Sequence, residues 1–207
     1  VGTDGSAGGR AVYRAGGYQP ERIGTPEVDV YLRGVVSTTT LTSFVYQLDG
    51  QMNYVLSDPG EWTLVWTLAK GEGGETRAQW VYRKSGLFSM GAEPSGGWDA
   101  ITFALNGTKQ IVGRSDGNLY ELQADTFTDD SEIIVREFTS AQIYKGGRRF
   151  FQSRLELEFE TNVALTSGQG SDPKVMESHS DDGGKTWSNP REAGLGVVGQ
   201  TKWRAVW

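Results

Sequence analysis

Residues 46–54 read Tyr-Gln-Leu-Asp-Gly-Gln-Met-Asn-Tyr, and this stretch decides the class of fold. Two short strand-like segments flank Asp49-Gly50, a pair that tolerates the positive φ angles of a two-residue hairpin turn. Residues 111–120 repeat the same order of strand, Asp-Gly, polar residue, strand and tyrosine. The alternation of short strands and tight turns between residues 44 and 122 is typical of meandering propeller blades, and the two copies indicate a repeat.

The rest of the chain has the same character. Helical periodicity is nearly absent, and the segments without Gly or Pro are rich in Val, Ile, Thr and aromatic residues, which favour strands. We therefore expect an all-β fold. The predicted strands are Phe44–Leu48, Asn53–Ser57, Trp62–Leu68, Gln79–Arg83, Ala100–Leu105, Gln110–Gly113, Leu119–Gln123, Glu132–Thr139, Arg154–Glu160, Lys174–Ser180 and the final segment.

A shift in composition near residue 131 predicts two regions. Residues 1–130 are expected to form an incomplete set of propeller-type blades. Residues 131–207 are expected to form a β-rich C-terminal region with longer, more charged strands. There, Leu155, Leu157 and Phe159 alternate with charged residues, as in a half-buried strand with one wet face. Because the chain starts at Val1 and an aromatic alternation stops at Trp207, we expect a fragment truncated at both ends.

Net charge and cysteine content limit the partners and the chemistry. The formal net charge is -6, and tight nucleic-acid binding needs clustered cations, so the charge argues against such binding. It is compatible with a protein that lets DNA pass without gripping it. The chain has no cysteine, which excludes disulfides and cysteine zinc sites. No apolar run approaches the roughly 18–20 residues of a membrane-spanning helix.

Residues 180–187 match the Asp-box pattern S-x-D-x-G-x-T-W. The pattern describes a hairpin in which the serine and aspartate bond turn amides, the glycine allows positive φ, and the threonine and tryptophan hold the turn on the sheet. Asp boxes also occur in sialidases, away from the catalytic face, so we interpret this one as structural. Its defining residues are Ser180, Asp182, Gly184, Thr186 and Trp187.

The other candidate residues favour no catalytic, cofactor or metal site. The single histidine, His179, has no metal-ligand partner at a suitable spacing and no nucleophile elbow near it. The glycines of residues 194–199 spell G-x-G-x-x-G without the helix that a dinucleotide site requires. An acidic patch departs from the EF-hand spacing, which leaves only an irregular calcium site open. The patch consists of Asp125, Asp129, Asp130 and Glu132.

One compact basic and aromatic cluster lies at residues 145–151. Lys145, Arg148 and Arg149 precede Phe150 and Phe151, which we place on a strand that enters a core. The low isoelectric point fits an acidic protein neighbour better than nucleic acid. The three basic residues are therefore the candidate contact with a partner protein.

Three groups of residues together resemble one family. The first group is residues 13–25 (Tyr-Arg-Ala-Gly-Gly-Tyr-Gln-Pro-Glu-Arg-Ile-Gly-Thr) and the second is residues 112–122. The third consists of the segments Asp172–Val175, Ser180–Trp187, Arg191–Gly196 and Trp203-Arg204. Their order along the chain is similar to that in packaged-DNA stabilisation proteins. These are the tail hub, or head-closure, proteins of short-tailed bacteriophages. Gly24 stands where a serine is commoner, and residues 177–179 replace apolar residues.

This resemblance implies a structural protein of the virion tail, assembled in the host cytoplasm and without enzymatic activity. It implies a propeller-containing hub that forms a ring of six copies, contacts the portal adaptor, tail needle and tailspikes, and retains packaged DNA. Two alternatives stay open: a sialidase-like Asp-box glycoside hydrolase fragment, and a carbohydrate-binding module. The module would use exposed tryptophans such as Trp62, Trp66 or Trp98.

Overall fold

The structure is a computed structural model in which the chain divides into two units, Val1–Arg136 and Glu137–Trp207. The division expected from composition, at residue 131, lies a few residues before this one. The residues that the structure describes are 2–4, 9–70, 74–86, 96–124, 126, 128–143, 146, 151–159, 164–168, 170–200 and 204–207.

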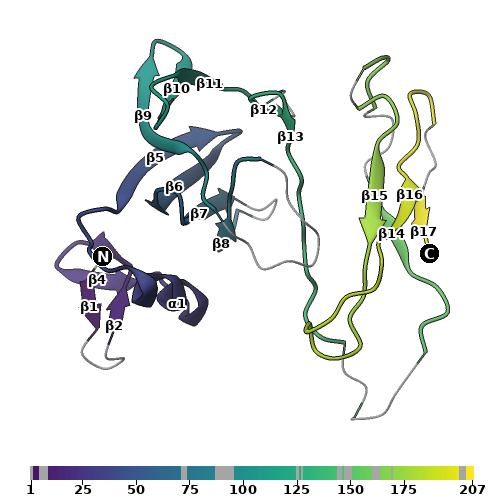
Figure 1. The fold of residues 1–207 in the computed structure, drawn as a ribbon, viewed down its shortest axis with the longest axis horizontal. Helices are drawn as coiled ribbons and strands as arrows, with labels where there is room; N and C mark the ends of the chain where they lie inside the picture. The colour runs from purple at the N-terminus through teal and green to yellow at the C-terminus, as the bar shows by residue number, and fades with distance from the viewer. Residues whose placement is uncertain are drawn as a thin grey trace. The chain divides into compact units, whose positions relative to one another are not determined.

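A four-stranded antiparallel sheet forms the centre of the first unit, in the order β5-β6-β7-β8 (Figure 1). Its first hairpin is the one predicted from residues 46–54. Asp49 and Gly50 have φ angles of 49° and 73°, as a two-residue turn between twisted strands requires. The strands are β5 (Thr42–Leu48), β6 (Gln51–Asp58), β7 (Trp62–Lys70) and β8 (Thr76–Tyr82).

One face of this sheet packs on a second antiparallel sheet. The second sheet consists of β9 (Ala100–Asn106), β10 (Lys109–Arg114) and β11 (Leu119–Leu122). Since side chains alternate along a strand, the even-numbered residues of β5 and the odd-numbered residues of β6 and β7 point to this interface. The shared core contains Tyr46, Val55, Val65, Trp98, Ala100 and Val112.

The opposite face of the central sheet packs on a helix, α1 (Pro26–Gly34). Val28 and Leu32, one helical turn apart, are buried against Leu56 and Leu64 of the sheet. The prediction that the chain lacks helices is wrong here. Thr25 caps the helix N-terminus and Pro26 begins it, which are signals that do not depend on a long apolar periodicity.

Short ladders precede the helix. The strand β1 (Gly2–Asp4) pairs with β2 (Gly9–Ala11), and β3 (Tyr13–Gly16) pairs with β4 (Gln19–Arg22). Val12, between β2 and β3, accepts backbone hydrogen bonds from Ile23 and Gly24 at 3.0 and 3.1 Å. A Cβ atom at position 24 would lie 3.2 Å from the Val12 nitrogen, so the two backbones approach closely at this glycine.

The first unit ends in a small hairpin of β12 (Thr128–Asp129) and β13 (Glu132–Ile133). The predicted strand Glu132–Thr139 is therefore wrong beyond Ile133, because residues 134–143 have no regular structure. These residues are exposed along most of their length, and none of the described strands pairs with them to supply the hydrogen bonds that a strand needs.

The second unit contains two described antiparallel ladders. In one, β14 (Glu156–Glu158) pairs with β17 (Arg204–Val206); in the other, β15 (Lys174–Glu177) pairs with β16 (Arg191–Gly194). The Trp207 Nε1–H donates to the Arg191 carbonyl at 2.9 Å and links the ladders. Both predicted strands, Arg154–Glu160 and Lys174–Ser180, are thus longer than the strands observed, and Glu160 lies outside the described residues.

The expected alternation of buried and exposed side chains at residues 155–159 is found only in part. Leu155 and Phe159 are half-buried, but Leu157 is 40% exposed even though its pairing partner Ala205 is 1% exposed. The all-β class is nonetheless confirmed apart from α1. Within the described ranges the strands form no closed propeller.

Candidate functional site

The loop between β15 and β16 contains the predicted Asp-box residues. Asp182 Oδ1 accepts hydrogen bonds from the Ser180 hydroxyl and from the backbone N–H groups of Lys185 and Thr186, each at 2.9 Å. Its Oδ2 accepts from the Thr186 hydroxyl at 2.6 Å. Ser180 Oγ in turn accepts from the Gly184 N–H at 2.8 Å. The structure therefore brings Ser180, Asp182, Gly184 and Thr186 into one network.

This network stabilises the charged form of the aspartate. Hydrogen bonds from the Thr186 side chain and backbone, followed by the one from Ser180, lower the pKa of Asp182 from 3.8 to about 2. Gly184 has a φ of 90°, a conformation that a side chain would strain. Since both carboxylate oxygens are engaged within the loop, Asp182 is suited to hold a turn and not to act as an acid or base.

Trp187 is more exposed than the Asp-box pattern predicts. It is 37% exposed, whereas a tryptophan that holds the turn on the sheet would be largely buried. Truncating it therefore removes less apolar contact than the truncation of a core tryptophan.

His179 contacts a serine and a carboxylate, as the histidine of a catalytic triad does, but the geometry differs from that of a triad. Its Nδ1 lies 3.2 Å from the Ser188 hydroxyl and 3.4 Å from a carboxylate oxygen of Glu177. In a triad the serine and the carboxylate contact different nitrogens of the ring, so that a proton can pass through it. Here both contact the same nitrogen, and Glu177 also accepts two hydrogen bonds from Arg191. The prediction that the chain is not an enzyme stays a prediction, which assays of glycoside hydrolysis would check.

Several predicted site residues cannot be placed. Lys145, Arg148 and Arg149, the candidate partner contact, lie outside the described residues, as does Asp125 of the acidic patch. In the part of the chain that is described, no group of three or more His, Asp or Glu residues could hold a metal ion. No helix in that part is long and apolar enough to cross a membrane.

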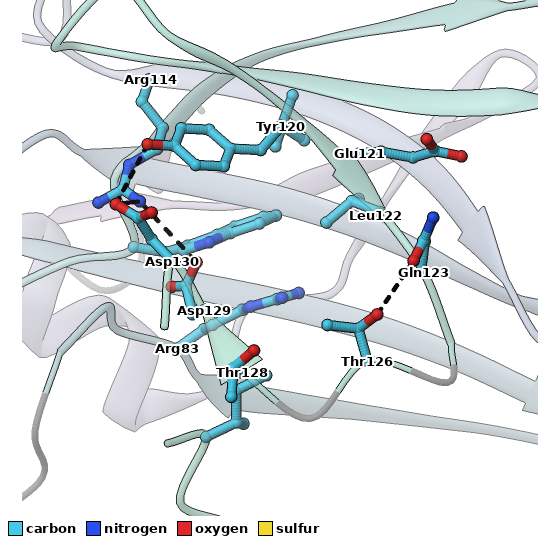
Figure 2. A pocket seen from close by; sticks show the side chains of 13 residues that line it. Arg83, Arg114, Tyr120, Glu121, Leu122, Gln123, Thr126, Thr128, Asp129 and Asp130 are labelled. Atoms are coloured by element: carbon cyan, nitrogen blue, oxygen red, sulfur yellow. Dashed lines mark hydrogen bonds and ion pairs between the residues drawn. The ribbon is translucent and has the colours of Figure 1, made fainter. Parts of the chain in front are cut away.

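The acidic residues Asp129 and Asp130 line a pocket in the first unit that the sequence does not indicate (Figure 2). The pocket has a volume of about 90 Å³ and lies among the β9–β11 sheet, β12 and the residue after β8. Its lining residues are Arg83, Trp98, Val112, Arg114, Tyr120, Glu121, Leu122, Gln123, Thr126, Thr128, Asp129, Asp130 and Ile134.

Arg114, at the end of β10, neutralises the acidic side of the pocket. It forms an ion pair with Asp99, and its Nη1 lies 3.5 Å from Asp130 and 4.0 Å from Asp129. Partial burial acts to lower the pKa of Arg114, but the hydrogen bond and charge of Asp99 outweigh it, so the pKa is raised. The guanidinium also lies 4.8 Å from the centre of the Tyr120 ring.

Arg83, which follows β8, has a different environment. Its guanidinium carbon lies 3.7 Å from the centre of the Trp98 ring, and its Nη1 donates to the Tyr46 hydroxyl at 2.8 Å. Trp98 and Tyr46 are 3% and 5% exposed, so a cation rests on a buried aromatic surface. The spacing of residues in the sequence does not indicate this site, because the site brings together residues from three separate segments.

The tryptophans proposed for carbohydrate binding are buried. Trp62, Trp66 and Trp98 are 7%, 8% and 3% exposed and belong to the packed interior of the first unit. The carbohydrate-binding hypothesis is therefore wrong for these residues, because a sugar would need an exposed ring face on which to stack.

Residues 135–207 match a family model described as bacteriophage P22 Gp10, beta-sandwich. The match spans the whole second unit. No curated protein and no solved structure matches the chain. The second unit is thus similar to a β-sandwich of a bacteriophage protein, which agrees with the expected resemblance to structural proteins of the phage tail and head closure.

Proposed function

We propose that this chain is a structural component of a bacteriophage tail. The observation that carries the proposal is the match of residues 135–207 to the P22 Gp10 β-sandwich. The motifs at residues 13–25 and 112–122 support it independently, since these two segments lie outside the matched region. The protein would contact other virion proteins and act in the tail without catalysing a reaction.

The finer role that we propose is that of a hub between the portal adaptor above and the tail needle or tailspikes below. Six copies would form a ring that closes the channel and helps to retain packaged DNA. A formal charge of -6 supports this role, because an acidic surface repels the phosphate backbone and lets DNA slide past. Closure of a ring also requires different surfaces on the two sides of each copy.

The first unit would supply propeller-type blades to this hub. The sheets β5–β8 and β9–β11 are antiparallel meanders that share one core face to face. Neighbouring blades of a propeller pack in the same manner. In the second unit, the Asp182 network would act as an Asp-box clasp that fixes the loop between β15 and β16.

Lys145, Arg148 and Arg149 are our proposed contact with an acidic neighbour in the tail. Arg149→Glu should slow docking to the adaptor and reduce the dependence of the docking rate on salt, because charges at an interface rim act mainly on the association rate. Arg154→Glu is the matched control, since the Arg154 side chain is 63% exposed and pairs within its own unit with Glu156. Equal docking rates for the two variants would remove the cluster from the interface.

The proposed role can be tested with a phage whose copy of the gene carries a stop codon. We expect packaged heads that lack the distal tail parts and lose their DNA, with restoration by the full-length protein supplied in trans. Heads that keep both their DNA and complete tails would contradict the hub role.

A further inference from the structure

Among the described residues, one cation that lines the pocket of the first unit, Arg83, has no matching anion. Arg83 is half-buried, and its guanidinium is fixed by the Trp98 ring at 3.7 Å and the Tyr46 hydroxyl at 2.8 Å. Among the described residues no carboxylate contacts it. Arg114, which lines the same pocket, is paired with three carboxylates, so its charge is balanced by neighbouring anions.

The acidic residues of the pocket are already engaged elsewhere. Asp129 accepts from the Ser85 hydroxyl at 2.6 Å, Asp130 accepts from the Tyr120 hydroxyl at 3.2 Å, and Glu121 pairs with Lys109 at 2.8 Å. These contacts, together with Arg114, hold the carboxylates in their present positions. None of these three carboxylates pairs with Arg83.

The two sides of the pocket have different chemistry. Figure 2 shows Arg114, Asp129 and Asp130 on one side and Gln123 with Thr126 on the other, where the Thr126 hydroxyl donates to Gln123 Oε1 at 3.0 Å. An anion that contacts Arg83 from the side of Gln123 and Thr126 keeps its distance from Asp129 and Asp130. The buried Trp98 beneath the guanidinium excludes water from one face, which strengthens a charge-assisted hydrogen bond.

The backbone beside the pocket is strained. Asp130 and Ser131, which form the turn between β12 and β13, have φ angles of 51° and 74° although neither is glycine. A two-residue hairpin turn requires positive φ at both positions, and this conformation is costly for residues other than glycine. The turn places Asp129 and Asp130 within 4.0 and 3.5 Å of the Arg114 guanidinium.

We propose that this pocket binds a carboxylate, supplied by an Asp or Glu side chain of a partner protein that inserts against Arg83. A volume of about 90 Å³ accommodates the end of one acidic side chain. It is well below the roughly 300 Å³ at which small-molecule sites begin, so a sugar ring or a nucleotide does not fit inside. This inference concerns the first unit and does not rest on the proposed role in a tail.

The test uses the whole chain and follows the indole N–H signal of Trp98 by NMR. We expect a saturable shift with the peptide acetyl-Ala-Glu-Ala-amide, and at least about tenfold weaker binding of acetyl-Ala-Gln-Ala-amide, because a hydrogen bond to a charged group is lost. Arg83→Gln should weaken binding of the Glu peptide by a similar factor. Sodium acetate should shift the same signal with lower affinity, since it brings the carboxylate alone.

Arg77→Gln is the matched control, because Arg77 lies on β8 with a 77% exposed side chain and should leave binding unchanged. If Arg83→Gln disturbs the circular dichroism spectrum, Arg83→Lys replaces it, since lysine keeps the charge but loses the planar contact with Trp98, and should also bind more weakly. No shift up to about 10 mM Glu peptide, or equal binding of the Gln peptide, would overturn the proposal. Tighter binding of inorganic phosphate or sialyllactose than of the Glu peptide would overturn the assignment to a protein carboxylate.

Discussion

Buried hydroxyl groups hold the two sheets of the first unit in register. The Thr63 hydroxyl accepts a hydrogen bond from the backbone N–H of Trp98 at 2.9 Å and pairs with the Ser57 hydroxyl at 2.8 Å. Thr63 and Ser57 are both 0% exposed, so no water can replace these bonds. Thr42 differs from Thr63 and Ser57, because its buried hydroxyl has no hydrogen-bond partner among the described residues.

Thr63→Val should lower the free energy of unfolding of the first unit by about 1–3 kcal/mol, because the Trp98 N–H and Ser57 lose their partner without access to water. Thr42→Val, the matched control, should change it by less than about 0.5 kcal/mol or raise it, since a buried hydroxyl without a partner is costly. Urea denaturation followed by tryptophan fluorescence measures both. Equal effects of the two substitutions would show that the Thr63 network does not stabilise the sheets.

Asp182 should titrate with a pKa of about 2, below its ordinary value of 3.8, because Thr186 and Ser180 donate to the charged form. The lowered pKa means that the carboxylate stabilises the loop at pH values above the ordinary pKa. This contribution is lost as the pH falls through about 2. NMR of the side-chain carboxyl carbon gives the midpoint directly.

Thr186→Val is the informative variant for this titration. It removes the hydroxyl that donates to Asp182 at 2.6 Å but keeps the backbone N–H, so the pKa should rise part of the way toward 3.8. A wild-type midpoint near the ordinary value, or a midpoint that Thr186→Val leaves unchanged, would contradict the network.

At the level of elements, the hairpins could be predicted and the helix could not. Asp49-Gly50 and Asp116-Gly117 specify turns locally, and the strands on either side need only pair with each other. The helix α1 has nine residues, too few for a clear periodicity, and its helical state depends on packing against the sheet. The combination of Thr25 and Pro26 was the available signal.

Leu32→Ala should destabilise the first unit by about 2–5 kcal/mol, because it leaves a cavity between α1 and the sheet. Leu32 is 0% exposed, whereas Val30 on the same helix is 62% exposed. Val30→Ala should therefore change the stability by less than about 0.5 kcal/mol. Thermal unfolding of the two variants checks this, and equal melting temperatures would mean that the helix does not depend on this contact.

On the scale of the whole molecule, the Asp182 loop could be predicted because its residues are contiguous in the sequence. The Arg83 pocket could not, since Arg83 and Tyr46 are 37 residues apart and meet only through the pairing of β5 to β8 and the packing of the second sheet. The strand predicted from Glu132 failed for a related reason: its composition favours a strand, but a strand needs a partner that composition does not supply.

The central claim is that the chain is a structural part of a phage tail. Immunogold electron microscopy of purified virions, with an antibody raised against residues 137–207, tests it most directly. We expect gold particles at the tail, at the junction with the head, on nearly every virion, and none after the gene is interrupted. Virions that carry no label while the protein remains in the soluble lysate would contradict the account.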